Sequence, residues 1–105
     1  MITAKVLKEN GNYRSFSCRG HAGYEDEGKD IVCAAVSILV INTANSLDKF
    51  TDNQLTASDD KYIRWEFNDI PDEKGQLLMD SLVLGLKGIE SKYGSNFLRL
   101  MIEEV

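Results

Sequence analysis

The stretch that decides the fold is a run of small and branched apolar residues that follows an aspartate. It reads Asp30-Ile31-Val32-Cys33-Ala34-Ala35-Val36-Ser37-Ile38-Leu39-Val40-Ile41. Asp30 is a favourable N-cap residue, so the sequence predicts a helix that begins at Ile31 and ends near Phe50. Apolar residues cover most of the circumference of this helix, which indicates burial on more than one side. In a small domain we expect a partner subunit to provide the second cover.

The segments before this helix alternate with a period of two, which is typical of strands. Ile2, Ala4 and Val6 share one face of a first predicted strand. Phe16 and Cys18 share one face of a second strand over residues 13–19, opposite Ser15, Ser17 and Arg19. The turn signal Asn10-Gly11 lies between the two, so we expect an N-terminal hairpin.

The segments after the helix repeat the pattern. Residues 55–58 and 62–67 predict two short strands around the turn Asp59-Asp60-Lys61. Ile70-Pro71-Asp72-Glu73 opens a second helix that runs to about Tyr93, and residues 97–102 predict a last strand. The apolar stripe of this second helix consists of Leu78, Leu82, Leu86 and Ile89, with Met79 and Val83 beside it. This order of elements predicts an α+β two-layer sandwich, with an antiparallel-rich sheet and two helices on one face.

Length and charge narrow the class of protein. A chain of 105 residues is enough for one domain, which we expect to cover residues 1–105. The formal net charge of −5 argues against direct contact with nucleic acid and suits a basic partner. Two cysteines make no disulfide framework, no secretory leader is visible, and the longest apolar run is too short to span a membrane. These features predict a soluble cytoplasmic protein with free thiols.

The candidate chemistry lies at the start of the first helix. Cys33 falls in the first turn, where the helix N-terminus favours a thiolate and free N–H groups can bind an oxyanion. The only histidine of the chain, His21, precedes it by twelve residues, and Ser37 shares a helix face with it. A thiolate beside an imidazole is the minimal equipment for nucleophilic acyl transfer. Gly20, Gly23 and Gly28 suggest a pliable loop over this site.

Other interpretations of the same residues remain open. Cys33 could be a small hydrophobe, Asp30 only a cap, and Ser37 a donor to the carbonyl one turn earlier. Cys18, His21 and Cys33 have the residue types of a zinc site, but a continuing strand would turn Cys18 and His21 to opposite sides, so we expect no metal and no cofactor. The two cysteines also lack the C-x-x-C spacing of a redox pair.

Two segments carry a resemblance to a known family. Gly20-His21-Ala22-Gly23-Tyr24 and Gly28-Lys29-Asp30-Ile31-Val32-Cys33-Ala34-Ala35-Val36-Ser37 closely resemble the ribosomal-processing cysteine proteases of the Prp family. The resemblance extends over the whole chain in length and element order. It implies a ferredoxin-like fold of order β-β-α-β-β-α-β, a homodimer, and removal of the N-terminal extension of a ribosomal large-subunit protein precursor.

The resemblance also implies residue roles. Cys33 would be the nucleophile that forms a thioacyl-enzyme, and His21 the base that takes its proton. Gly20, Asp30 and Ser37 would support them, with Asp30 as the helix cap and a candidate to orient His21. The substrate loop would comprise Ala22, Gly23, Tyr24, Glu25 and Gly28, although many relatives have a small residue where this chain has Glu25. The alternative from another class is a non-catalytic module that docks on the ribosome or a ribosomal protein.

Overall fold

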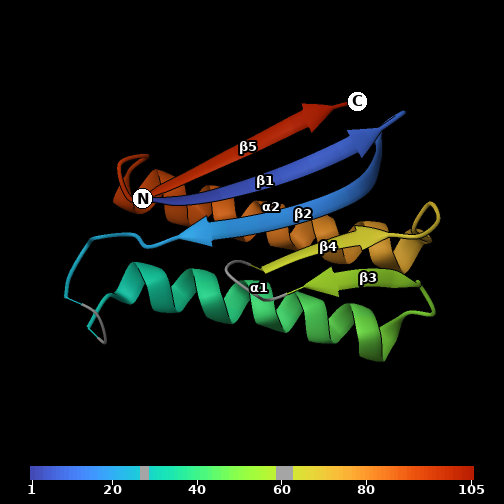
Figure 1. Cartoon of the computed structure of the whole chain (residues 1–105), viewed down its shortest axis with the longest axis horizontal. Helices are drawn as coiled ribbons and strands as arrows, with labels where there is room; N and C mark the ends of the chain where they lie inside the picture. Colours follow the sequence, from blue (N-terminus) through green and yellow to red (C-terminus); the bar gives the residue numbers. More distant parts are fainter. Residues whose placement is uncertain (27–28, 59–62) are drawn as a thin grey trace.

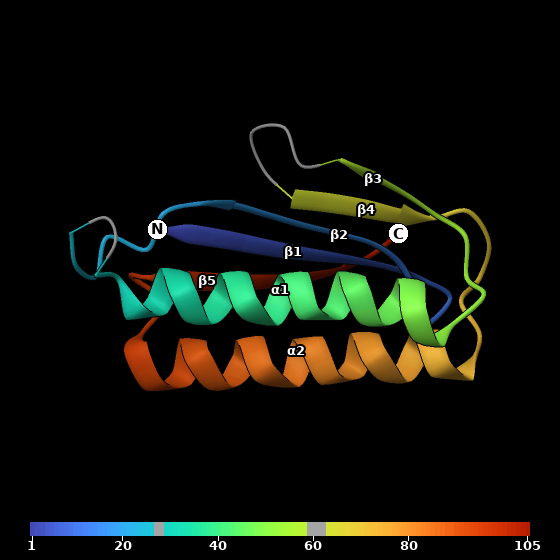
Figure 2. The same cartoon turned by 90° about the horizontal axis from the view of Figure 1, so that it is seen from below.

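The computed structural model describes residues 1–26, 29–58 and 63–105. Within these residues two helices and five strands follow one another as β1 (Ile2–Glu9), β2 (Asn12–Gly20), α1 (Ile31–Phe50), β3 (Leu55–Ser58), β4 (Ile63–Phe67), α2 (Glu73–Tyr93) and β5 (Leu98–Glu104). The strands form one sheet, and both helices cover the same face of it (Figures 1 and 2). The predicted two-layer α+β sandwich is confirmed. The predicted turn at residues 59–61 lies outside the described residues.

The sheet is mixed, with strand order β3-β4-β2-β1-β5. The pairs β1–β2, β2–β4 and β3–β4 are antiparallel, whereas β1 and β5 are parallel. The run β2-α1-β3-β4-α2-β5 has the β-α-β-β-α-β order of a ferredoxin-like fold, and β1 is an additional strand inserted between β2 and β5. The element order β-β-α-β-β-α-β expected from the resemblance is present, whereas the sheet departs from a plain ferredoxin-like sheet by this inserted strand.

The hairpin of β1 and β2 contains an irregularity that the sequence pattern does not reveal. Leu7 pairs with Ser15 but Lys8 pairs with Tyr13, so Arg14 is an extra residue on β2. This bulge turns the Tyr13 side chain to the buried face, although simple alternation placed it opposite Phe16. The Tyr13 hydroxyl donates to Asp80 Oδ1 at 2.6 Å, and burial together with that carboxylate raises the pKa of Tyr13. The bond ties the hairpin to α2.

The core lies between the sheet and the two helices. Phe16 and Trp65 pack with ring centroids 4.8 Å apart on the helix-facing side of the sheet. From α2, Leu82 and Leu86 are fully buried, which confirms the stripe predicted for this helix. The helices approach closely where Gly85 meets Leu39, because a β-carbon at Gly85 would lie within 2.6 Å of that side chain.

Helix α1 buries one stripe and exposes another. Val36 and Val40 belong to the stripe that packs on the sheet, whereas Ile38 on the opposite side is 70% exposed. On α2, Leu77 and Leu84 are also exposed, at 68% and 73%. By length and composition alone α1 could cross a membrane, but in this fold its buried stripe belongs to the core. The exposed apolar side chains carry no cover within the described part of the chain.

Candidate active site

Helix α1 begins where the sequence predicts, and Asp30 organises its first turn. The Asp30 carboxylate, 9% exposed, accepts hydrogen bonds through Oδ1 from the backbone N–H groups of Val32 and Cys33, both at 3.0 Å. Its Oδ2 accepts from the N–H of Tyr24 at 3.0 Å. One side chain therefore caps the helix and holds the preceding loop against it.

These hydrogen bonds keep Asp30 ionised. Donation from the Cys33 N–H, the largest cause, and from the Tyr24 and Glu25 N–H groups lowers the pKa of Asp30, although burial acts in the opposite direction. Within the described residues, none of the hydrogen bonds that this carboxylate accepts comes from His21; the donors are the backbone N–H groups of Tyr24, Val32 and Cys33, and the Cys33 side chain is a further cause of the lowered pKa. Among the described residues, no hydrogen bond joins Asp30 to His21, so the expected role of Asp30 in orienting His21 is not supported by a direct contact.

The engagement of Asp30 corrects one expectation. Free N–H groups at the start of α1 were expected to bind an oxyanion, but those of Val32 and Cys33 already donate to Asp30 Oδ1. The N–H of Ala34 donates to the Asp30 carbonyl at 3.1 Å. Because the ionised Asp30 carboxylate caps the helix and accepts from these N–H groups, they are not free to bind an oxyanion.

A different backbone donor points at the candidate nucleophile. The N–H of Ala22 donates to Cys33 Sγ at 3.2 Å, and the Ala22 side chain is only 3% exposed. Gly20 makes this approach feasible: its φ is +96°, and a β-carbon there would collide with the Met1 carbonyl oxygen. Gly23 also has a positive φ, of +72°. The two glycines thus fold residues 20–23 back over the helix start.

The loop and the helix enclose a hollow of about 380 Å³. Its lining contains the candidate base, the candidate nucleophile and most of the residues expected around them, namely His21, Gly23, Glu25, Asp30, Cys33, Ala34 and Ser37. A neighbouring hollow of about 240 Å³ also includes His21 and Cys33, together with Gly20 and Cys18. The fold thus brings His21 and Cys33, which are twelve positions apart along the chain, to the same hollow.

Ser37 and Tyr24 differ in how they relate to this hollow. Ser37 lines it and, among the described residues, makes no side-chain hydrogen bond, whereas Thr43 of the same helix donates to the carbonyl one turn earlier. The Tyr24 ring instead packs edge-on against Tyr93 and Phe97, with centroids 5.5 and 5.1 Å away. Tyr24 anchors the loop to the end of α2, a role that short-range sequence pattern does not reveal. Gly28 lies outside the described residues.

Cys18 lies on the helix-facing side of β2 and lines the smaller of the two hollows with Cys33. It is half-buried, and burial, followed by the nearby charge of Cys33, raises the pKa of the Cys18 thiol to about 11. Across residues 1–26, 29–58 and 63–105, no three His, Cys, Asp or Glu side chains gather as metal ligands would. The structure therefore does not assemble the alternative metal site of Cys18, His21 and Cys33.

A half-buried thiol at a helix start, with a histidine lining the same hollow, is an arrangement compatible with thiol-dependent hydrolysis. The sequence model of the family described as cysteine protease Prp matches residues 1–97. A ribosomal processing cysteine protease Prp from Bacillus subtilis is 33% identical over 104 residues, covering 91% of this chain and 93% of the relative. The chain belongs to the cysteine protease Prp family and is a cysteine protease.

Solved structures show the same fold. A ribosomal processing protease Prp from S. aureus, in complex with a covalently linked product peptide, superposes with a TM-score of 0.91 at 24% identity, covering 97% of this chain and 99% of that one. A protein from Streptococcus mutans superposes with a TM-score of 0.87 at 32% identity, over 100% of this chain and 96% of the other. At 24% identity the first likeness concerns the fold alone.

Proposed function

We propose that this protease removes the N-terminal extension of a ribosomal large-subunit protein precursor, with Cys33 and His21 as a catalytic dyad. The observation that carries the proposal is the hollow shared by the Cys33 sulfur and the His21 imidazole, with the Ala22 N–H directed at the sulfur. The substrate class is supported by the name of the B. subtilis relative, a ribosomal processing protease.

The reaction needs one proton carrier and one nucleophile. His21 takes the proton of the Cys33 thiol, and the sulfur attacks the scissile carbonyl carbon. When the carbon–nitrogen bond breaks, His21 returns the proton to the leaving amine, which becomes the new N-terminus of the ribosomal protein. The extension stays on Cys33 as a thioacyl group. Water, deprotonated by His21, then cleaves the carbon–sulfur bond and restores the thiol.

The Ala22 N–H supports the charge that moves during these steps. It compensates negative charge on Cys33 Sγ before attack, at 3.2 Å. Since the carbonyl carbon bonds to that sulfur, the developing oxyanion forms within reach of the same donor, in place of the helix amides that Asp30 occupies. Asp30 acts as a positioning residue, because it joins the loop that carries Ala22 to the helix that carries Cys33.

The surroundings of the hollow fit a basic peptide. Glu25 lines it, and Glu25 and Asp26 are exposed. Ser37 offers a hydroxyl to the peptide backbone on the same helix face as Cys33. Negative charge at the entrance speeds the encounter with a positively charged precursor. The enzyme acts as a soluble cytoplasmic protein.

The exposed apolar stripe of α1 supports a homodimer. Ile38 and Ile41 lie on its outer side, and Leu84 of α2 is exposed in the same layer of helices. A symmetric partner would remove these side chains from water. We expect sedimentation to give a dimer at micromolar concentration and Ile38→Glu to give a folded monomer. A monomeric unmodified protein would contradict this part of the proposal.

The direct test is cleavage of the candidate substrate. The chain is incubated with the extended precursor of the ribosomal protein, and the products are weighed by mass spectrometry. We expect two fragments, one with the mass of the mature protein, and no cleavage with Cys33→Ala. If the unmodified chain binds the precursor without cutting it, the non-catalytic docking module is the better description.

A further inference from the structure

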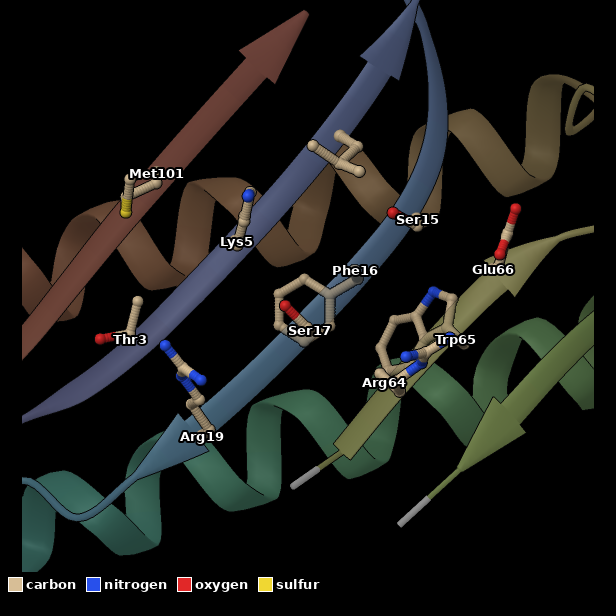
Figure 3. A pocket seen from close by; sticks show the side chains of 11 residues that line it. Thr3, Lys5, Ser15, Phe16, Ser17, Arg19, Arg64, Trp65, Glu66 and Met101 are labelled. Carbon is tan, nitrogen blue, oxygen red and sulfur yellow. The ribbon is translucent and has the colours of Figure 1, made fainter. Parts of the chain in front are cut away.

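The second face of the sheet is not covered by helices in the described part of the chain. Both helices lie on the same side in Figure 2, and Figure 3 looks onto the opposite side with the helices behind the strands. On this open face the register places Thr3 opposite Arg19 and Lys5 opposite Ser17. Ser17 is in turn opposite Arg64 on β4. Three neighbouring strands thus contribute polar side chains to one area.

This area is hollowed. A depression of about 500 Å³ is lined by side chains that include three cations, Lys5, Arg19 and Arg64, and one anion, Glu66. Figure 3 shows Ser17 between Lys5, Arg19 and Arg64, with Thr3 beside Arg19 and Lys5, whereas Glu66 lies toward the other end of β4. Positive charge therefore gathers in a chain whose net charge is −5.

Lys5, Arg19 and Arg64 differ in whether a carboxylate already pairs with them. Lys5 Nζ lies 3.3 Å from Glu103 Oε2, and Glu66 is bound by Arg14 at 3.4 Å. Arg19 and Arg64 form no ion pair with the residues that the structure describes. Their guanidinium groups line the depression together with Thr3 and Ser17 and present hydrogen-bond donors.

We propose that this open face binds the phosphodiester backbone of RNA. Arginine, lysine, serine and threonine are the side chains that contact phosphate oxygens, and the planar guanidinium matches phosphate in a bidentate way. The choice of RNA over an acidic protein rests in part on the proposed function, since a ribosomal-protein substrate is found among RNA. Contacts of this type position a nucleic acid without reading its sequence.

The position of Arg19 connects this face to the active site. Arg19 precedes His21 by two residues and lines both the depression on the open face and the smaller hollow beside Cys33. RNA on the open face would therefore hold a ribosomal particle next to the catalytic loop. The proposal departs from the expectation drawn from net charge, because net charge does not describe how charges are distributed over the faces of a protein.

Fluorescence anisotropy tests the inference without any cleavage step. The probe is a short fluorescein-labelled RNA hairpin, and the competitors are a DNA hairpin of the same sequence and polyglutamate. We expect RNA affinity to fall steeply as salt rises from about 50 to about 200 mM. If the DNA hairpin binds as tightly as the RNA hairpin, the face recognises phosphate alone. If the DNA hairpin binds more weakly, the face prefers RNA. Both results support a backbone site.

Matched variants locate the site. Arg19→Gln with Arg64→Gln should weaken RNA binding by about tenfold or more, and should reduce the slope of log affinity against log salt by about 1.8. Lys74→Gln with Lys87→Gln removes the same charge from exposed positions of α2 and should leave the slope unchanged. If the glutamine variants do not fold, Arg19→Lys with Arg64→Lys keeps the charge and should keep the slope while losing bidentate affinity.

Three results would overturn the inference. They are an RNA affinity of the unmodified chain that does not depend on salt, equal weakening by the α2 control pair, and polyglutamate binding at least as tight as RNA. The last result would identify an acidic protein as the partner. Because binding is measured without substrate, these outcomes are distinct from failure of the proposed function, which shows only as absence of peptide cleavage.

Discussion

The two cysteines of this chain lie in regions that differ in chemistry despite a similar degree of burial. Cys33 at the start of α1 and Cys18 on β2 are both half-buried and line the same small hollow. Cys33 Sγ accepts the Ala22 N–H, whereas burial and the charge of Cys33 raise the pKa of Cys18 to about 11. We therefore expect Cys33 to be the more reactive thiol, because a backbone donor is directed at its sulfur.

The largest expected effect separates the two regions by activity. Cys33→Ala and His21→Ala should each lower the rate of precursor cleavage by a factor of about 10⁴ or more, because the nucleophile and its base act as a unit. Cys18→Ser should retain most of the activity. The measurement is the rate of product formation by mass spectrometry, with folding checked by circular dichroism. A large loss of rate in folded Cys18→Ser would erase the contrast and reopen the metal-site interpretation.

Alkylation of the thiols sharpens the comparison. Because burial raises the pKa of Cys18 to about 11, little of it is thiolate at pH 7, and its alkylation should become faster as the pH rises toward that value. Cys33, with a backbone donor at its sulfur, should react first at pH 7. Peptide mapping after iodoacetamide treatment measures both rates. Faster labelling of Cys18 at neutral pH would contradict the assigned environments.

Asp30 tests how the region around Cys33 is held together. Asp30→Ala removes the acceptor of three backbone N–H groups, so we expect the melting temperature to fall by roughly 4–8 °C and the cleavage rate to fall with it. Asp30→Asn keeps one oxygen acceptor and should lose less stability. Thermal unfolding and cleavage rates are compared. A lower melting temperature with an unchanged rate would show that Asp30 is a helix cap and nothing more.

The smallest expected effect concerns the acidic loop tip beside Cys33. Glu25→Gln with Asp26→Gln should slow capture of the basic precursor a fewfold at low salt and leave it nearly unchanged at high salt, where charges are screened. Asp48→Asn with Asp52→Asn, at exposed positions near the other end of α1, is the matched control. Capture that is equally fast in both variants at low salt would remove electrostatic steering from the proposal.

The local sequence pattern was sufficient to predict the helices and strands and to select the candidate site residues. Asp30 as N-cap, the start of α1 at Ile31 and the buried stripe of α2 follow from residues within a few positions of one another. Cys33 in the first turn and Ser37 on the same face follow from helix geometry. The family is indicated by residues 20–37, a contiguous motif. Each of these inferences needs only the periodicity of a helix or strand and the chemistry of a short segment.

Tertiary structure decided the features that depend on residues far apart along the chain. The Arg14 bulge turns Tyr13 toward Asp80, and the donor to Cys33 Sγ comes from Ala22 rather than from the helix start, where Asp30 occupies the amides. The charge of the open face appears only when β1, β2 and β4 lie side by side, which collects Lys5, Arg19 and Arg64. Strand register and loop direction arise from long-range packing, so no short segment of sequence specifies them.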